Sequence, residues 1–553
     1  MHRNFEPRRR DPLKGRGRRE VLALALLVLA ALACQVAYDL VSIPDPEGAA
    51  TDAFIPAPTA MPRPTRTPRP SLEGTPTPKP AQPTLAAAFD DLAQFRAAMR
   101  PRFAGDVDQF PNATRYAIEV GVTFNADGSA TLTGRERIRY TNRQDFPLDA
   151  VYLMLWPNDD AQYLSEMALW RVTVDGADAP PDFEHDGLAA RVDLPQPLDP
   201  GAAVEVSAEF EVIAYPGIDT TGPARFGLTH DVLLAPTFYP LVPRLTEGGE
   251  WQTMPAPFGG DTTNSDTALY WWRVTAPADL TIVGTGTVVE TRSSSLTQTL
   301  TLITGPVRDL ALVVGPLELT QREVDGITVN AYLLDEHAEF TDRMLDYTVG
   351  QIETLQAAVG SYPFAELDVV DAPGAFGGIE YPGTIFIGVV DDRDFFKYAT
   401  VHEVGHQWFY SLIGDDQLLE PWLDEAAATY TEVLYEEEVH GQRAAQDLLS
   451  YFWDDVESSD APGLPIGLPV GDYPSGSDYG TIVYSKGALF FDALRREMGD
   501  RIFFRFLKDY YAAYRYGFAR SQDFQATAEQ TCACDLDALF DLWVYKGGEV
   551  TRP

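Results

Sequence analysis

Two short stretches, Val401-His402-Glu403-Val404-Gly405-His406 and Trp422-Leu423-Asp424-Glu425, decide how this chain folds and what it can bind. Histidines four residues apart lie one above the other on the same face of a helix. Two imidazoles need this spacing to bind one tetrahedral ion, so His402 and His406 predict one zinc ion per chain. Glu403 lies about 100° further around the helix, where its carboxylate can accept a proton from a water that the ion holds.

The residues around the first stretch favour a helix. Asp391 and Asp392 offer side-chain oxygens that can cap a helix N-terminus, and Gly414 is a residue type that ends helices. We therefore expect one helix from the aspartates to this glycine. The alternative is that the two histidines are ordinary buried polar residues, and the second stretch argues against that alternative.

A catalytic zinc ion usually has three protein ligands, so the histidine pair needs a third. A proline in the first turn and a glycine at the end predict a second helix over about 421–440. Glu425 falls in its first turns, and a short antiparallel connection would bring this carboxylate opposite the two imidazoles. Glu432 shares a face with Glu425 and can hold the other nitrogen of a zinc histidine. Because three glutamates follow at 436–438, an exposed acidic face is the alternative for Glu432.

The order His402, Glu403, His406 and then, after eighteen residues, Glu425 resembles the M1 family of gluzincin metallopeptidases, which includes aminopeptidase N and leukotriene A4 hydrolase. Two more segments resemble motifs of that family in the expected order. They are Gly377-Gly378-Ile379-Glu380-Tyr381, upstream of the first helix, and Tyr484-Ser485-Lys486-Gly487-Ala488, downstream of the second. The resemblance covers about 111–553.

The resemblance implies a zinc metallopeptidase, and more finely an aminopeptidase that removes N-terminal residues from peptides. It implies that Glu403 is the general base and that the Tyr484 phenol donates to the oxyanion of the tetrahedral intermediate. It also implies that Glu380, beside the turn at Gly377 and Gly378, binds the free α-amine of the substrate.

Two residues of the upstream motif depart from the family pattern. Ile379 and Tyr381 stand where the family has Met and Asn, so peptidase chemistry is implied more firmly than recognition of an α-amine. A zinc endopeptidase of the same fold and a surface-anchored, non-catalytic binding or scaffold protein are the alternatives. From the residues alone, Glu380 can also be an exposed side chain in a glycine turn, and Tyr484 a core aromatic at a helix start.

The rest of the body predicts two folded domains. Apolar residues alternate with polar ones from about Tyr116, so we expect an all-β domain over 111–320, which the resemblance implies is saddle-like. Helical periodicity is prominent afterwards, so we expect an α+β, mainly helical domain over 321–553, which the resemblance implies is thermolysin-like. A short helix and lead-in are expected over 86–110.

The N-terminal segment has its own composition. Basic residues precede an apolar run, Val21–Ala33, so residues 1–42 predict a signal or membrane-anchor segment that places the body outside the membrane. The segment is either an uncleaved anchor or a lipoprotein signal cleaved and lipidated at Cys34, because the residues before it are similar to a lipobox. Residues 43–85 contain twelve prolines and predict a disordered, extended linker.

The formal net charge is −40 at pH 7, and the acidic excess lies in the body that follows the linker. Such a body repels nucleic acid, so nucleic acid is not an expected partner. The expected partners are peptides, which the resemblance implies, and a membrane, which the N-terminal segment predicts.

Cys532 and Cys534 are separated by one residue. In an oxidising compartment they can form a disulfide, and two free thiols are the alternative. The sequence offers no neighbouring ligands that would make this pair a second zinc site.

Overall fold

The computed structural model describes residues 91–159, 163–217, 225–257, 264–374 and 377–553. The membrane-anchor segment expected at 1–42 and the linker expected at 43–85 lie outside these residues. Within the described ranges, no helix combines the length and the apolar character needed to cross a membrane.

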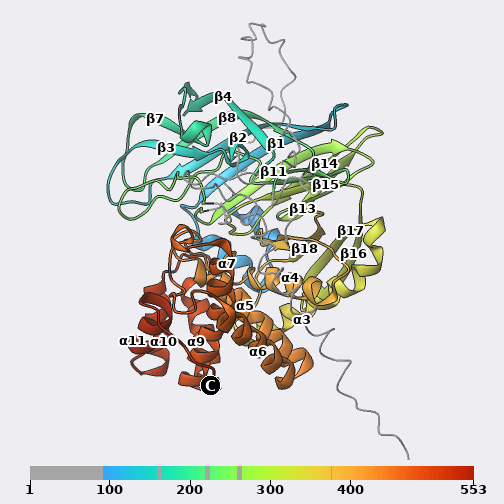
Figure 1. The fold of residues 1–553 in the computed structure, drawn as a ribbon. Helices are drawn as coiled ribbons and strands as arrows, with labels where there is room; N and C mark the ends of the chain where they lie inside the picture. Colours follow the sequence, from blue (N-terminus) through green and yellow to red (C-terminus); the bar gives the residue numbers. More distant parts are fainter. Residues whose placement is uncertain (1–90, 160–162, 218–224, 258–263, 375–376) are drawn as a thin grey trace, which may run out of the picture.

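The first half of the chain is built from β-strands, as Figure 1 shows. Its largest sheet consists, in spatial order, of β13 (Thr287–Ser293), β14 (Thr297–Ile303), β11 (Ala268–Pro277), β1 (Thr114–Phe124), β2 (Ala130–Thr141), β8 (Ala203–Ala214), β4 (Ser165–Val174) and β5 (Ala177–Asp178). Along β8 buried and partly exposed residues alternate, which is the period-two pattern of a strand with one face on the core.

Two smaller sheets complete this β half. One consists of β12 (Thr281–Gly284), β15 (Ala311–Gly315), β10 (Val232–Pro236) and β9 (Gly227–Thr229). The other consists of β3 (Leu148–Met154), β7 (Ala189–Leu198) and β6 (Asp182–Glu184). All five residues of β10 are buried, so this short strand lies in the interior of the protein.

A mixed five-stranded sheet lies next to the helices. Its spatial order is β16 (Leu317–Val324), β17 (Ile327–Leu334), β18 (Glu366–Asp371), β20 (Thr384–Ile387) and β19 (Gly378–Ile379). β17 and β18 run parallel and are connected through helix α3 (Thr341–Ala358). β19 is the edge strand that pairs antiparallel with β20, and it carries Gly378, one of the two glycines of the upstream motif.

Helices make up the rest of the second half. They are α4 (Arg393–Gly405), α5 (Glu425–Tyr435), α6 (Gln442–Ser458), α7 (Gly476–Tyr479), α8 (Gly487–Met498), α9 (Asp500–Tyr514), α10 (Ser521–Cys532) and α11 (Asp537–Phe540). Short π-helical segments follow α5 (Glu436–His440), α7 (Gly480–Lys486) and α11 (Asp541–Tyr545). The predicted order of a β part followed by an α+β, mainly helical part is confirmed (Figure 1).

The predicted end of the first helix was wrong. α4 begins after Asp392, whose side chain accepts two hydrogen bonds from the first turn, as expected for a cap. It ends at Gly405 and does not continue to Gly414, because Tyr410 has a φ of 113° and donates its N–H to the carbonyl three residues later. The N–H of His406 still donates to the carbonyl of His402 at 3.1 Å, so both histidines keep the helical register.

Three other expectations are refined. The predicted helix over 421–440 consists of a 3-10 turn at Pro421–Leu423, then α5, then a π-helical segment, and it ends at Gly441, which has a φ of 91°. The short helix expected over 86–110 consists of two 3-10 segments, Leu92–Ala98 and Pro101–Gln109. Cys532 and Cys534 form a disulfide.

Candidate active site

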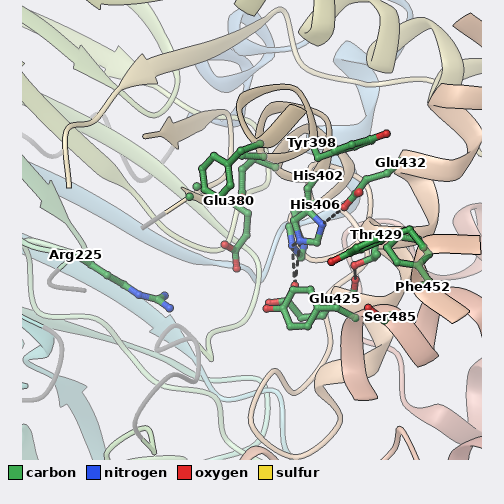
Figure 2. Close-up of a pocket in the computed structure, with 17 residues that line it drawn as sticks. Arg225, Glu380, Tyr398, His402, His406, Glu425, Thr429, Glu432, Phe452 and Ser485 are labelled. Atoms are coloured by element: carbon green, nitrogen blue, oxygen red, sulfur yellow. Dashed lines mark hydrogen bonds and ion pairs between the residues drawn. The ribbon is translucent and has the colours of Figure 1, made fainter. Parts of the chain in front are cut away.

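Helices α4 and α5 bring His402, His406 and Glu425 together, as Figure 2 shows. The Oε2 atom of Glu425 lies 3.1 Å from Nε2 of His402 and 3.3 Å from Nε2 of His406. The two Nε2 atoms are 3.0 Å apart. Two neutral imidazole nitrogens and one carboxylate oxygen that face a common point form the donor set that zinc prefers in hydrolytic sites. The residues present therefore fit one such ion.

Small residues allow the two helices to approach closely. A Cβ atom added to Gly405 would lie 2.5 Å from Oγ1 of Thr431 and 3.3 Å from Cα of Ala428. These distances are shorter than ordinary van der Waals contacts, so a larger residue at this position of α4 would require Thr431 and Ala428 of α5 to move. All eleven residues of α5 are buried, which places Glu425 inside the protein.

The Nδ1 nitrogen of each imidazole also has a hydrogen-bond partner. Nδ1 of His402 lies 3.0 Å from Oε1 of Glu432, and Nδ1 of His406 lies 3.1 Å from the carbonyl oxygen of Phe409. An acceptor at Nδ1 fixes the tautomer in which Nε2 presents its lone pair to a metal. Glu432 is only 7% exposed, so the alternative of an exposed acidic face does not hold for it.

Charge is concentrated in this cluster when no metal is bound. Burial lowers the pKa of His402, but hydrogen bonds to Glu425 and Glu432 outweigh it and raise this pKa to about 9. Burial raises the pKa of Glu425, but the neighbouring imidazolium groups outweigh it and hold this pKa well below its usual range. Protons therefore occupy the metal-free cluster, and a metal ion has to displace them.

Glu403 lies beside the ligand cluster and touches the upstream glycine motif. Burial raises the pKa of its carboxyl to about 8 in the metal-free protein. Within the described residues, no donor reaches its buried Oε2 atom. A Cβ atom on Gly378 would lie 2.5 Å from Oε1 of Glu403, so glycine is required there by the close approach of this carboxylate.

Glu380 directly follows β19 and is 6% exposed, so it is not the exposed turn residue of the alternative reading. It lines the same cavity as Gly377, Gly378 and Glu403. The side-chain amide of Gln417 donates to Oε1 of Glu380 at 2.9 Å.

Tyr484 lies in the π-helical segment that follows α7 and is 8% exposed. Its ring stacks on the imidazole of His402, with ring centroids 5.7 Å apart and planes 18° from parallel. The next motif residue but one, Lys486, is buried and donates to the carbonyls of Pro462 and Leu464 at 2.8 and 2.6 Å. The lysine thus fixes the segment that places the tyrosine over the ligand cluster.

Several residues of the cavity were missed by the sequence analysis. They are Arg225, Phe395, Tyr398, Ala399, Thr429, Tyr451, Phe452 and Ser485. Those of α4 precede His402 by three, four and seven residues, so helical spacing alone would have placed them on its face. No sequence signal connects Arg225 with the site, because it comes from the β half and reaches the cavity from the side opposite the helices (Figure 2).

Comparison with known sequences identifies the helical half. Residues 345–543 match the peptidase family M1 domain. Aminopeptidase N of Streptomyces lividans is 24% identical over 268 residues, which are 44% of this chain and 31% of that protein. Aminopeptidase 2, mitochondrial, of Saccharomyces cerevisiae is 26% identical over 263 residues, which are 43% of this chain and 27% of that protein. The chain thus matches about a third of the length of these curated relatives.

Comparison with solved structures covers more of the chain. The M1 zinc metallopeptidase from Deinococcus radiodurans superposes with a TM-score of 0.60 at 19% identity, over 79% of this chain and 94% of that chain. At this identity the likeness shows the fold, including both the β half and the helical half. Residues 345–543, which contain the three converging residues together with Glu403 and Tyr484, thus form a peptidase family M1 domain.

Proposed function

We propose that this chain is a zinc-dependent aminopeptidase that removes N-terminal residues from peptides. The observation that carries the proposal is the convergence of His402, His406 and Glu425 on one point. Glu403 and Glu380 line the same cavity. Two carboxylates outside the ligand set supply the two further functions that an exopeptidase needs, a general base and a receptor for the α-ammonium group.

His402, His406 and Glu425 would hold the zinc ion, which when bound supplies a Lewis acid for the scissile carbonyl and lowers the pKa of water. Glu403 takes the proton of the attacking water and later gives it to the leaving amine. Its buried position, and a pKa raised to about 8 in the metal-free protein, suit a group that both accepts and donates a proton near neutral pH.

Tyr484 and Glu380 act on the substrate directly. The phenol of Tyr484, which stacks over His402, donates a hydrogen bond to the developing oxyanion. Glu380 binds the α-ammonium group, which fixes the N-terminal residue next to the general base. Peptides as substrates are also supported by a mutant of the Deinococcus radiodurans M1 zinc metallopeptidase that was solved with a Tyr-Ser-Ala substrate.

The test is a panel of aminoacyl p-nitroanilides, each with a free and with an N-acetylated α-amine, with and without a zinc chelator. We expect turnover of the free substrates only, its loss with the chelator, and its return with added zinc. The variant Glu403→Gln should keep the zinc and lose at least about 100-fold in kcat. Cleavage of the N-acetylated substrates would favour the endopeptidase alternative. Zinc binding without turnover of any substrate would favour the non-catalytic alternative.

We also propose that the folded body is tethered to the outer face of a membrane by residues 1–42. The support is the sequence alone, namely the basic residues that precede the apolar run Val21–Ala33. Separation of membrane and soluble fractions tests the tether, and the variant Cys34→Ser separates its two forms. A membrane-bound wild type whose mass shows a lipidated N-terminal cysteine, a mass change that the variant lacks, indicates cleavage and lipidation. A wild type and variant that both keep residues 1–33 indicate an uncleaved anchor.

A further inference from the structure

The side chain of Gln417 joins two carboxylates at the back of the cavity. Its Nε2 atom donates to Oε1 of Glu380 at 2.9 Å and to Oδ2 of Asp424 at 3.0 Å. Gln417 is 4% exposed, and both carboxylate side chains are buried as well. It comes from the connection between α4 and α5, a segment in which the sequence analysis placed no functional residue.

This position needs a side chain that can donate two hydrogen bonds. One carboxylate oxygen of Glu380, one of Asp424 and one ring nitrogen of His406 lie within 4.8 Å of one another, a distance at which two ionised carboxylates repel each other. The two hydrogens of a single amide nitrogen diverge and can reach both oxygens at once. Rotation of the amide would place its oxygen against two carboxylates, so only one orientation of Gln417 is compatible with these neighbours.

The two partners of Gln417 have separate tasks. Oδ1 of Asp424 accepts a hydrogen bond from the N–H of Glu425 at 2.9 Å and so caps the N-terminus of α5. Glu380 lines the cavity. Gln417 therefore connects the carboxylate assigned to the substrate amine with the helix that carries the third ligand residue.

A second glutamine holds the main chain of the same residue. Nε2 of Gln407 lies 3.3 Å from the carbonyl oxygens of Glu380 and Tyr381, and its Oε1 accepts from the N–H of Gly383 at 2.8 Å. The backbone of Glu380 is thus fixed independently of Gln417, which leaves the direction of its carboxylate as the property that Gln417 controls.

We propose that Gln417 is a positioning residue that aims the Glu380 carboxylate at the α-ammonium group of the substrate. The proposal rests on the proposed function, because it takes Glu380 as the residue that binds the α-ammonium group of the substrate. With one oxygen of Glu380 held by Gln417, the other oxygen keeps a fixed direction into the cavity. Without Gln417, Glu380 and Asp424 repel each other and the carboxylate of Glu380 turns away from the amine.

The test measures amine recognition directly. Leucinol, which carries the α-amine, and 4-methylpentan-1-ol, which lacks it, are compared as competitive inhibitors of the zinc-loaded full chain. The main variant is Gln417→Met, which keeps the length of the side chain and removes both donors. The matched control is Gln252→Met, which also removes a hydrogen bond from a glutamine to an aspartate, from Nε2 of Gln252 to Oδ2 of Asp416 at 2.7 Å, one residue away from Gln417.

We expect Gln417→Met to raise the inhibition constant of leucinol by about tenfold, which corresponds to the loss of one hydrogen bond to a charged group. The same variant should change the inhibition constant of 4-methylpentan-1-ol by less than about twofold. For an aminoacyl substrate with a free α-amine, KM should rise by a larger factor than kcat falls. The control should leave the ratio of the two inhibition constants as in the wild type. In a Glu380→Ala background, adding Gln417→Met should no longer affect leucinol, because the two residues act as one unit.

Equal weakening of both inhibitors by Gln417→Met, or a loss that persists in the Glu380→Ala background, would overturn the positioning role. Equal inhibition of the wild type by both compounds would instead overturn amine recognition itself, and with it the proposed aminopeptidase. If the methionine variant does not fold, Gln417→Asn takes its place, because it keeps the amide but retracts it by one methylene. The test is then the ratio of variant to wild-type inhibition constant for leucinol and for 4-methylpentan-1-ol.

Discussion

Removal of the Glu432 carboxylate tests the metal centre without changing a ligand. Oε1 of Glu432 lies 3.0 Å from Nδ1 of His402, and the residue is 7% exposed. Loss of such a partner of a zinc histidine typically costs about 10- to 100-fold in metal affinity, or about 1.4–2.7 kcal/mol. Glu432→Gln keeps an acceptor and loses the charge, so we expect the lower value for it and the higher value for Glu432→Ala.

The loss should depend on pH in a defined direction. In the metal-free protein the pKa of His402 is raised to about 9, in part by the hydrogen bond to Glu432. Below this pH, wild-type zinc binding has to expel a proton from His402. Either variant lowers the pKa of His402, so protons compete less. The decrease in zinc affinity should therefore be largest above about pH 9 and smaller at pH 7, where weaker proton competition offsets part of it.

Zinc affinity is measured by titration against a metal chelator of known affinity at pH 7 and at pH 9.5. The control is Glu438→Gln, which removes an exposed carboxylate from the π-helical segment directly after α5. We expect the zinc affinity of the control to equal that of the wild type at both pH values. An alanine variant at position 432 that folds and binds zinc as tightly as the wild type at both pH values would refute the reasoning. A loss of equal size at both pH values would refute its proton-competition part.

Three further substitutions test the remaining geometry. Tyr484→Phe should lower kcat by about 100- to 1,000-fold in a reporter assay with little change in zinc content, since it removes one oxyanion donor; a kcat within about threefold of the wild type would exclude this role. Gly378→Ala should push the Glu403 carboxylate aside and lower kcat at unchanged zinc content, whereas Gly471→Ala, whose added Cβ would meet no neighbour within 4 Å, should not. Arg308→Met should lower the free energy of unfolding by about 3 kcal/mol in urea titrations, because it leaves buried carbonyl groups unpaired; an unchanged midpoint would show that these bonds do not stabilise the fold.

Local sequence was sufficient to predict that His402 and His406 converge on one point, where the structure also places Glu425. The four-residue spacing of His402 and His406 places them on one face of any helix, whatever packs around it. Glu432 was predicted on the same ground, because it lies two turns after Glu425. The carbonyl of Phe409 that holds His406 was not predictable, since a backbone group carries no mark in the sequence and its position depends on the turn after α4.

Gly414 shows why the predicted end of the first helix was wrong. Glycine after a helix usually indicates the end of that helix, but α4 had already ended at Gly405. At position 414 a Cβ atom would overlap the guanidinium group of Arg308, a residue of the β half more than a hundred positions earlier. This glycine is required by tertiary packing, and nothing in its immediate sequence distinguishes the two causes.

The contact between Arg308 and Gly414 is one of several that join the β half to the segment between His406 and Glu425. Nε of Arg308 donates to the carbonyl of Tyr410 at 2.9 Å, and Gln252, also of the β half, donates to Asp416 at 2.7 Å. The β half thus contacts the segment that connects α4 to α5, and from this segment Gln417 reaches the carboxylate of Glu380. The β half provides none of the three converging ligand residues. Through the buried Arg308 it supports the connection between α4 and α5, so its packing bears on how these two helices face each other at His402, His406 and Glu425.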